Sequence, residues 1–280
     1  MPTMKPGELV SVGDHIWRLL CGNPGMMTGP GTNTYLVGDQ TLAVIDPGPV
    51  DDHHCQAIIA AAQSLGKPIE KIIVTHTHRD HSPGAHALSA ATGAQLYGPE
   101  APDDGLQDEL WQPRHLLADG DHIDVGGLSL HVLHTPGHVG NHLCYLTTDG
   151  VLFSGDHLIQ GSTVVIAPPS GSMSAYMQSL QKLMAFTISR IAPGHGDMIE
   201  TPQQLIKQTL QHRQQREDKV WQALGSAPER LDQLVKRVYD DVPEFLHGIA
   251  QLSLQAHLIK LQEEHRAQFD LEGWHRADGY

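Results

Sequence analysis

The feature that most restricts what this chain can fold into is a cluster of potential metal ligands directly after an apolar segment. The run Ile72-Ile73-Val74-Thr75 is typical of a buried strand, and it continues into His-x-His-x-Asp-His, formed by His76, His78, Asp80 and His81. In extended backbone, side chains two residues apart project to the same side, so His76 and His78 can hold one ion together. Asp80 and His81 then point elsewhere. Because imidazole with carboxylate suits zinc better than magnesium or calcium, the pattern predicts a pair of metal ions, with zinc as the expected metal.

Three more segments place a potential ligand just past an expected strand. They end in Pro136-Gly137-His138, Gly155-Asp156 and Pro193-Gly194-His195. A glycine directly before the ligand permits a tight turn and a close approach of the backbone, so each side chain can be aimed at a shared point. We therefore expect four loops to converge at one edge of the sheets, bringing His138, Asp156 and His195 to the first cluster.

The order of apolar and helical patterns predicts a mixed α/β fold followed by a helical region. Short apolar runs bounded by Gly, Pro and Asp predict strands at 34–37, 41–45, 71–75, 128–133, 142–146 and 151–154. Helical patterns cover 51–65, 84–92 and 172–184, where Ser172 can cap the first turn. After Pro202 the pattern predicts helices to about Leu224, over 231–239 and over 252–264, then a short hairpin near 269–274. We expect a catalytic domain over 1–205 and a helical domain over 206–280.

Composition narrows the class of partner and the compartment. The formal charge is −14, and residues 1–200 contain 8 Lys and Arg against 20 Asp and Glu, so a polyanion is disfavoured as a high-affinity partner. The three cysteines are too few and too far apart for a disulfide framework, which indicates reduced thiols. The first residues lack the apolar core of a secretory signal, and no run of 18 apolar residues occurs. We expect a cytoplasmic protein with no membrane partner; the sequence does not indicate an oligomeric state.

Several motifs together resemble the metallo-β-lactamase superfamily, and in particular its lactamase-like endoribonuclease branch. The matching segments lie at 23–25, 31–38, 75–82, 136–138 with His142, Tyr176-Met177, 193–196, His212-Arg213 and Arg216-Glu217. The resemblance implies a four-layer αββα sandwich with the metals at one edge, followed by a winged-helix-like C-terminal domain. Two departures are Ser82-Pro83-Gly84, where the family usually has Gly-Gly, and Val139-Gly140-Asn141, where Thr and Asp are more usual.

The resemblance also assigns the ligands. It implies that one metal is held by His76, His78 and His138, the other by Asp80, His81 and His195, and that Asp156 bridges them. For His142, four residues after His138, it suggests a role in orienting a ligand or polarising the substrate.

Three further candidates are open between a structural and a functional role. Asn33, in Gly-Thr-Asn-Thr-Tyr, can either shape a turn or face the site as a catalytic residue. Arg213 and Arg216, with Lys219, have near-helical spacing that is typical of a solvated face, and they are the basic groups available to bind an anionic substrate.

These residues predict a dinuclear metal-dependent hydrolase that uses a metal-bridging hydroxide oriented by Asp80. The resemblance favours a phosphodiesterase that acts on single-stranded RNA. The acidic charge and the lack of a basic tract favour the alternative, hydrolysis of a small acyl substrate such as a thioester, a lactone or a β-lactam. A non-enzymatic metal-containing binding module is the remaining alternative, and it would require ligand losses that the sequence does not show. A closed structural zinc site would tend to use cysteines.

Overall fold

The computed structural model describes residues 5–277, and the chain forms two compact units. The first unit comprises the residues up to 135 together with 141–162 and 187–202. The second comprises 136–140, 163–186 and the residues from 203 onward. Each unit has its own core.

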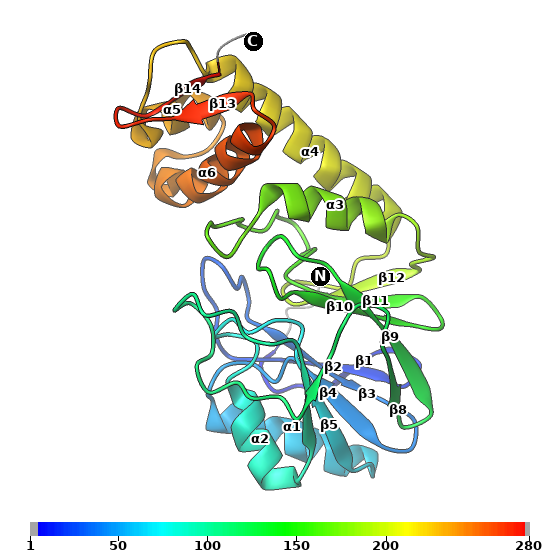
Figure 1. Ribbon diagram of the computed structural model, residues 1–280. Helices are drawn as coiled ribbons and strands as arrows, with labels where there is room; N and C mark the ends of the chain where they lie inside the picture. The colour runs from blue at the N-terminus through cyan, green and yellow to red at the C-terminus, as the bar shows by residue number, and fades with distance from the viewer. Residues whose placement is uncertain (1–4, 278–280) are drawn as a thin grey trace. The chain divides into compact units, whose positions relative to one another are not determined.

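The first unit contains a seven-stranded sheet (Figure 1). Its strands, in spatial and chain order, are β1 (Val10–Gly13), β2 (Ile16–Leu20), β3 (Asn33–Val37), β4 (Leu42–Ile45), β5 (Ile69–Ile73), β6 (Gln95–Gly98) and β7 (His115–Leu116). Strands β1 to β4 pair antiparallel, whereas β4 to β7 are parallel. Helices connect β4 to β5 and β5 to β6, whereas a loop without a helix connects β6 to β7, and the carboxyl ends of these parallel strands meet at one edge of the sheet.

A five-stranded sheet forms the second layer of strands in this unit. Its order is β12 (Arg190–Pro193), β11 (Val151–Gly155), β10 (Leu143–Thr147), β9 (Leu128–His134) and β8 (His122–Val125). Only β11 and β12 are parallel. The loops that follow β11 and β12 therefore leave from the same edge.

Two helices cover the outer face of the seven-stranded sheet. Helix α1 (Asp52–Leu65) begins at Asp51, whose carboxylate accepts hydrogen bonds from two backbone amides of the first turn, and it ends at Gly66 in the left-handed conformation. Helix α2 (Gly84–Thr92) packs with α1 on the apolar outer face of the strands. The opposite face of this sheet packs on the five-stranded sheet through side chains such as Tyr35 and Phe153. The layers of the first unit are thus helices, sheet and sheet.

The second unit is mainly helical. Its elements are α3 (Met173–Leu183), α4 (Pro202–Ala223), α5 (Leu231–Val238), the 3-10 turn η1 (Glu244–Leu246), α6 (His247–Glu263) and the hairpin β13 (Ala267–Phe269) with β14 (Trp274–Arg276). Ser172 caps α3, as predicted, by accepting a hydrogen bond from the Ala175 amide. Buried residues of α4, α5, α6 and the hairpin form one apolar core.

The predicted strands and helices are present, with ends shifted by a few residues. The largest shift is in α6, which begins at His247 and not at Leu252. The structure groups α3 with the C-terminal helices, and the predicted boundary between 205 and 206 stays a prediction. Between residues 5 and 277, no helix has both the length and the apolar composition needed to cross a bilayer. The cytoplasmic location stays a prediction.

Candidate metal centre

Strand ends of both sheets deliver six of the predicted ligands to one place in the first unit. His76, His78, Asp80 and His81 follow β5, whereas Asp156 follows β11 and His195 follows β12. The ligand atoms of Asp80, His81 and His195 lie within 4.8 Å of one another, and so do those of His76, His81 and Asp156. His81 belongs to both groups and is completely buried.

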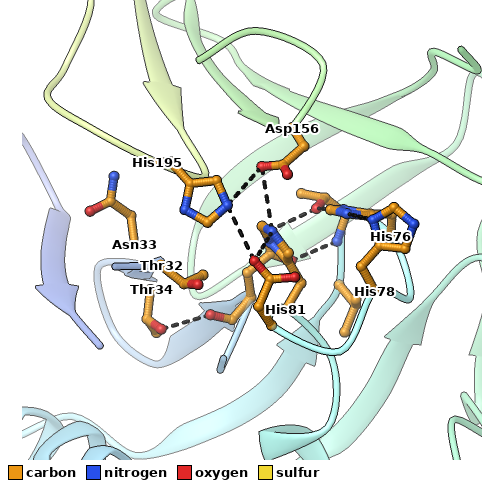
Figure 2. A network of polar contacts seen from close by, with 12 residues as sticks. Thr32, Asn33, Thr34, His76, His78, His81, Asp156 and His195 are labelled. Carbon is orange, nitrogen blue, oxygen red and sulfur yellow. Dashed lines mark hydrogen bonds and ion pairs between the residues drawn. The ribbon is translucent and has the colours of Figure 1, made fainter. Parts of the chain in front are cut away.

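Four donor atoms in this cluster have the spacing of a tetrahedral metal site. Nε2 of His81 lies 3.4 Å from Oδ2 of Asp80 and 3.4 Å from Oδ1 of Asp156. Nε2 of His195 lies 3.3 Å and 3.2 Å from the same two oxygens, and Figure 2 shows His195, Asp156 and His81 turned toward one another. Ligand bonds of about 2.0–2.1 Å to a tetrahedral ion place neighbouring donors about 3.3–3.4 Å apart. The residues present therefore fit a zinc-like ion.

Nδ1 of the His81 ring and Nδ1 of the His195 ring are both held by the protein. Nδ1 of His81 donates to Oδ2 of Asp46 at 2.9 Å, and Nδ1 of His195 donates to the Gly31 carbonyl at 3.1 Å. With the proton on Nδ1, the tautomer leaves the Nε2 lone pair toward the cluster. Such outer partners are typical of histidines that bind metals, because they set both the tautomer and the ring orientation.

The same carboxylate also orients His76, through Thr75. The Thr75 hydroxyl donates to Oδ2 of Asp46 at 2.8 Å, so its oxygen accepts from Nδ1 of His76 at 3.0 Å. Nε2 of His76 then faces Nδ1 of His78, and these two nitrogens are 2.9 Å apart. His76 and His78 converge as predicted from their spacing in the sequence.

The buried histidines and carboxylates of this cluster shift one another's pKa values. Burial lowers the pKa of His195, but the Asp156 and Asp80 carboxylates raise it to about 10. Burial acts in the same direction on His81, yet the carboxylates around it raise its pKa well above the usual range. Burial raises the pKa of Asp156, and the two histidines reverse this and lower it well below its usual range. By contrast, burial and the neighbouring histidines lower the pKa of His76, which is therefore a neutral ligand. Without a metal, His81 and His195 hold protons that an ion would displace.

His138, the seventh predicted ligand, lies in the second compact unit. Its Nδ1 donates to the Val165 carbonyl at 2.8 Å, which fixes the orientation of the ring. Gly137 precedes it with φ 148°, and a Cβ atom at that position would lie 2.4 Å from the Tyr176 backbone. The glycine is therefore required for the turn that presents His138.

His142 and Asn33 contact protein groups around the ligands. His142 is fully buried, its Nδ1 bonds to Thr135 Oγ1 at 3.0 Å, and its Nε2 accepts from the Asp156 amide at 3.2 Å. Asn33, also fully buried, donates from Nδ2 to the Pro193 carbonyl at 2.9 Å and to the Gly196 carbonyl at 2.8 Å. These contacts favour orienting roles, for His142 on the Asp156 backbone and for Asn33 on the loop that carries His195. A catalytic role for either residue stays a prediction.

Arg213 and Arg216 are buried in the second unit, where both make internal contacts. Arg213 donates to the Val164 carbonyl and lies over the Tyr176 ring. Arg216 forms a two-bond ion pair with Asp241 and lies over the Tyr239 ring. The expected solvated face is therefore wrong for these two, because the tertiary structure covers them; they are 3% and 7% exposed. Their predicted role in binding substrate stays a prediction.

Asp46 is a residue of the site that was not predicted from the sequence, although, like Asp156, it is an acidic residue directly after a buried strand. Asp46 directly follows the buried strand β4, precedes Pro47-Gly48 and has φ 51°, a left-handed conformation that is uncommon outside glycine. It is 2% exposed, and its carboxylate accepts from the Thr75 amide at 2.7 Å in addition to the bonds described above. Asp46 therefore supports two of the ligand histidines.

Comparisons with known proteins agree with this architecture. Residues 27–195 match the family model described as the metallo-beta-lactamase superfamily, and residues 231–274 match the beta-lactamase associated winged helix domain. A beta-lactamase domain protein from Burkholderia ambifaria has the same fold, with a TM-score of 0.83, 19% identity, and coverage of 99% of this chain and 96% of that one.

Two curated relatives carry names that refer to different kinds of protein. A beta-lactamase-like protein 2 homolog from Drosophila melanogaster is 34% identical over 88% of this chain and 87% of its own length. An atrochrysone carboxyl ACP thioesterase from Aspergillus fumigatus is 30% identical over 78% of this chain and 67% of its own length. The endoribonuclease branch stays a prediction, whereas the broader resemblance and the mixed α/β fold with a C-terminal winged-helix domain are confirmed. The chain, with its His and Asp groups able to bind metal, belongs to the metallo-β-lactamase superfamily of hydrolases.

Proposed function

We propose that this protein is a dinuclear metal-dependent hydrolase that cleaves the acyl bond of a thioester. The observation that carries the metal-dependent part of this proposal is the arrangement of His81, His195, Asp80 and Asp156, in which the four histidine-to-carboxylate separations are 3.2–3.4 Å. Ordinary ion pairs would shorten toward hydrogen-bond distance. This spacing supports a site adapted to an ion.

We assign seven ligands to two divalent ions, with zinc as the expected metal. His76, His78 and His138 would hold one ion, Asp80, His81 and His195 would hold the other, and Asp156 would be the ligand shared by both. Two such ions would polarise a scissile carbonyl or phosphoryl oxygen and would supply hydroxide from water near pH 7. The donor set of imidazoles and carboxylates suits zinc, and among the described residues these groups contain no cysteine.

The chain's own groups then orient the reactants. The Asp80 side chain is 30% exposed, compared with 13% for Asp156 and 6% for His195, so Asp80 is the ligand that faces arriving substrate and water. Its carboxylate is placed to accept a proton from the attacking water. His142 fixes the Asp156 backbone, and Asn33 fixes the turn that bears His195.

The choice of a thioester over RNA depends on charge. The predicted phosphate-binding groups Arg213 and Arg216 are buried, and Lys219 is paired with Asp240 at 2.8 Å. The relative from Aspergillus fumigatus that bears a thioesterase name supports an acyl substrate. RNA remains the second candidate, because the motifs quoted in the sequence analysis also resemble the endoribonuclease branch.

The test compares two substrates with one preparation of metal-loaded protein. We expect chelator-sensitive turnover of an N-acetylcysteamine thioester and little cleavage of a labelled, unstructured single-stranded RNA. Arg216→Ala should lower the melting temperature, since a buried acceptor and Asp241 lose their donor at a cost of about 1–3 kcal/mol, but should leave thioester turnover per folded molecule unchanged. Brisk RNA cleavage with no thioester turnover would instead establish the second candidate.

A further inference from the structure

A loop of uncharged residues is attached directly to the ligand His195. This methionine loop, residues 22–31, has no charged side chain and contains Met26 and Met27. Its base is fixed where the Asn23 side chain exchanges two 2.9 Å hydrogen bonds with Thr32, and where the Gly31 carbonyl accepts from the His195 ring. Thr32 also forms a β-bridge with His195. Met26 lies five residues from Gly31, and thus within about 17 Å of it along the chain.

A second loop is attached to the segment that carries the other ligands. This leucine loop, residues 99–112, hydrogen-bonds through Gln107 Oε1 to the Thr77 hydroxyl at 2.7 Å. Asp108 donates its amide to the Thr77 carbonyl at 2.8 Å and accepts from the Ser82 hydroxyl at 2.9 Å. Leu106 precedes Gln107 directly and Leu110 follows Asp108 by two residues. Its apolar side chains are therefore held close to the ligand segment that begins at His76.

Both loops expose large apolar side chains. Met26 is 70% exposed, Met27 53%, Leu106 51% and Leu110 72%. Isolated exposed apolar residues are ordinary, but here two pairs occur on two loops, one hydrogen-bonded to His195 and the other to the segment that carries His76, His78, Asp80 and His81. The leucine loop also borders an open cavity of about 310 Å³ whose lining includes Trp111 but neither of the two leucines.

The charge of the leucine loop limits what can bind there. Residues 99–112 contain five acidic side chains and no Lys or Arg, and three of the acidic ones line the cavity. A phosphate-rich polymer would be repelled by these carboxylates, whereas an uncharged hydrocarbon chain would not. The methionine loop, which has no charge at all, fits the same kind of ligand.

We propose that Met26, Met27, Leu106 and Leu110 form the recognition surface for the apolar acyl chain of the substrate and make the enzyme selective for longer chains. The catalytic test of this surface rests on the proposed thioester hydrolysis. A binding test does not, so failure of the surface can be distinguished from failure of the proposed function. Flexible methionine side chains adapt to ligands of varied shape, which suits selection by length more than by exact structure.

The experiment uses metal-loaded protein and N-acetylcysteamine thioesters with acetyl, butyryl, hexanoyl and octanoyl groups. Each fully buried methylene contributes roughly a fourfold gain, so partial burial of the six added carbons should give octanoyl at least about a 30-fold higher kcat/KM than acetyl. We expect Met26→Ser with Met27→Ser, or Leu106→Ser with Leu110→Ser, to reduce that ratio about tenfold or more while acetyl turnover changes little. Leu271→Ser, at a fully exposed leucine of the second unit, is the matched control.

Binding provides the independent measurement. Calorimetry with the S-octyl and S-ethyl thioethers of N-acetylcysteamine needs no hydrolysis, so a preference for S-octyl that both double variants lose would support the surface even if no thioester is cleaved. Equal binding of the two thioethers by the wild type would overturn the proposal. An unchanged octanoyl-to-acetyl ratio of kcat/KM in both double variants would also overturn it. The same holds if the substitutions leave this ratio unchanged and alter only the oligomeric mass in solution.

Discussion

Asp46→Asn tests whether one buried carboxylate sets the metal affinity of the whole centre. Asparagine tolerates left-handed backbone, so φ 51° is retained, and its remaining oxygen can still accept from the Thr75 amide. Its NH2 group, however, replaces the oxygen that accepts from Nδ1 of His81. Two donors cannot face each other, so His81 must move its proton to Nε2, the atom that faces the cluster.

The expected size of the effect follows from the position of His81 in both ligand groups. Loss of an outer partner of a metal-binding histidine typically weakens metal binding about 10–100-fold, or about 1.4–2.7 kcal/mol. Asp46→Ala should be worse for folding, because the Thr75 amide and the His81 ring would both lose their acceptor at about 1–3 kcal/mol each. Asp46→Asn should therefore lose metal affinity and, because the protonated His81 of the metal-free protein loses a carboxylate partner, also some metal-free stability, although less than Asp46→Ala.

The assay is zinc competition against a chromophoric chelator, with melting temperatures of the metal-free proteins measured in parallel. Asp51→Asn is the matched control, since asparagine also caps a helix and the Asp51 carboxylate accepts hydrogen bonds from the first turn of α1. An Asp46→Asn protein that binds zinc as tightly as Asp51→Asn would refute the role assigned to Asp46.

Three further predictions concern the ligands, the protons and the turn at His138. His76→Ala should abolish turnover and lower the metal content, whereas His53→Ala, at an exposed position, should change neither; equal effects would contradict the ligand assignment. Since the carboxylates, acting against burial, raise the pKa of His195 to about 10, the metal-free protein gains stability that is complete below about pH 6.5 and is lost toward pH 10. Melting temperatures should fall over that range while the apparent zinc affinity rises, and a flat profile for both would contradict the reasoning. Gly137→Ala should lower the metal content because its Cβ would collide with backbone, whereas Gly140→Ala has room and should not; elemental analysis distinguishes the two.

The ligands could be predicted from sequence because each depends on local structure. A strand followed by a potential ligand, with glycine directly before His138, Asp156 and His195, is visible in a few consecutive residues. His76 and His78 converge because of the period of extended backbone alone. The role of Asp46 could not be predicted from a few consecutive residues. Its partners Thr75 and His81 are 29 and 35 residues away, so only the pairing of β4 with β5 brings them together.

The two wrong predictions, the solvated face and the start of α6, also result from tertiary contacts. Helical spacing suggested a solvated face for Arg213 and Arg216, but spacing does not show that Tyr176 and Asp241 will cover them. Helix α6 was predicted to begin at Leu252, and Gly248, which lowers helix propensity by about 1 kcal/mol relative to alanine, lies before that residue. The structure starts it at His247, whose ring contacts the Tyr239 and Val242 carbonyls, so a tertiary contact outweighs the local preference.

The bonds from Asn33 to Pro193 and Gly196 have a consequence for the order in which the protein is made. They connect residues 160 and 163 positions apart, so the loop that carries His195 can be positioned only after nearly the whole first unit has left the ribosome. The segment that ends at His81 emerges earlier by 114 residues, on the order of 10 s at ordinary rates of synthesis. Throughout that interval the nascent chain carries four predicted ligands in one short segment and lacks His195, so any ion captured then is held by an incomplete set and can exchange. Final metal occupancy should therefore follow closure of β12, the last strand of the first unit, and should report on completed folding of that unit and not on the metal that the nascent chain met first.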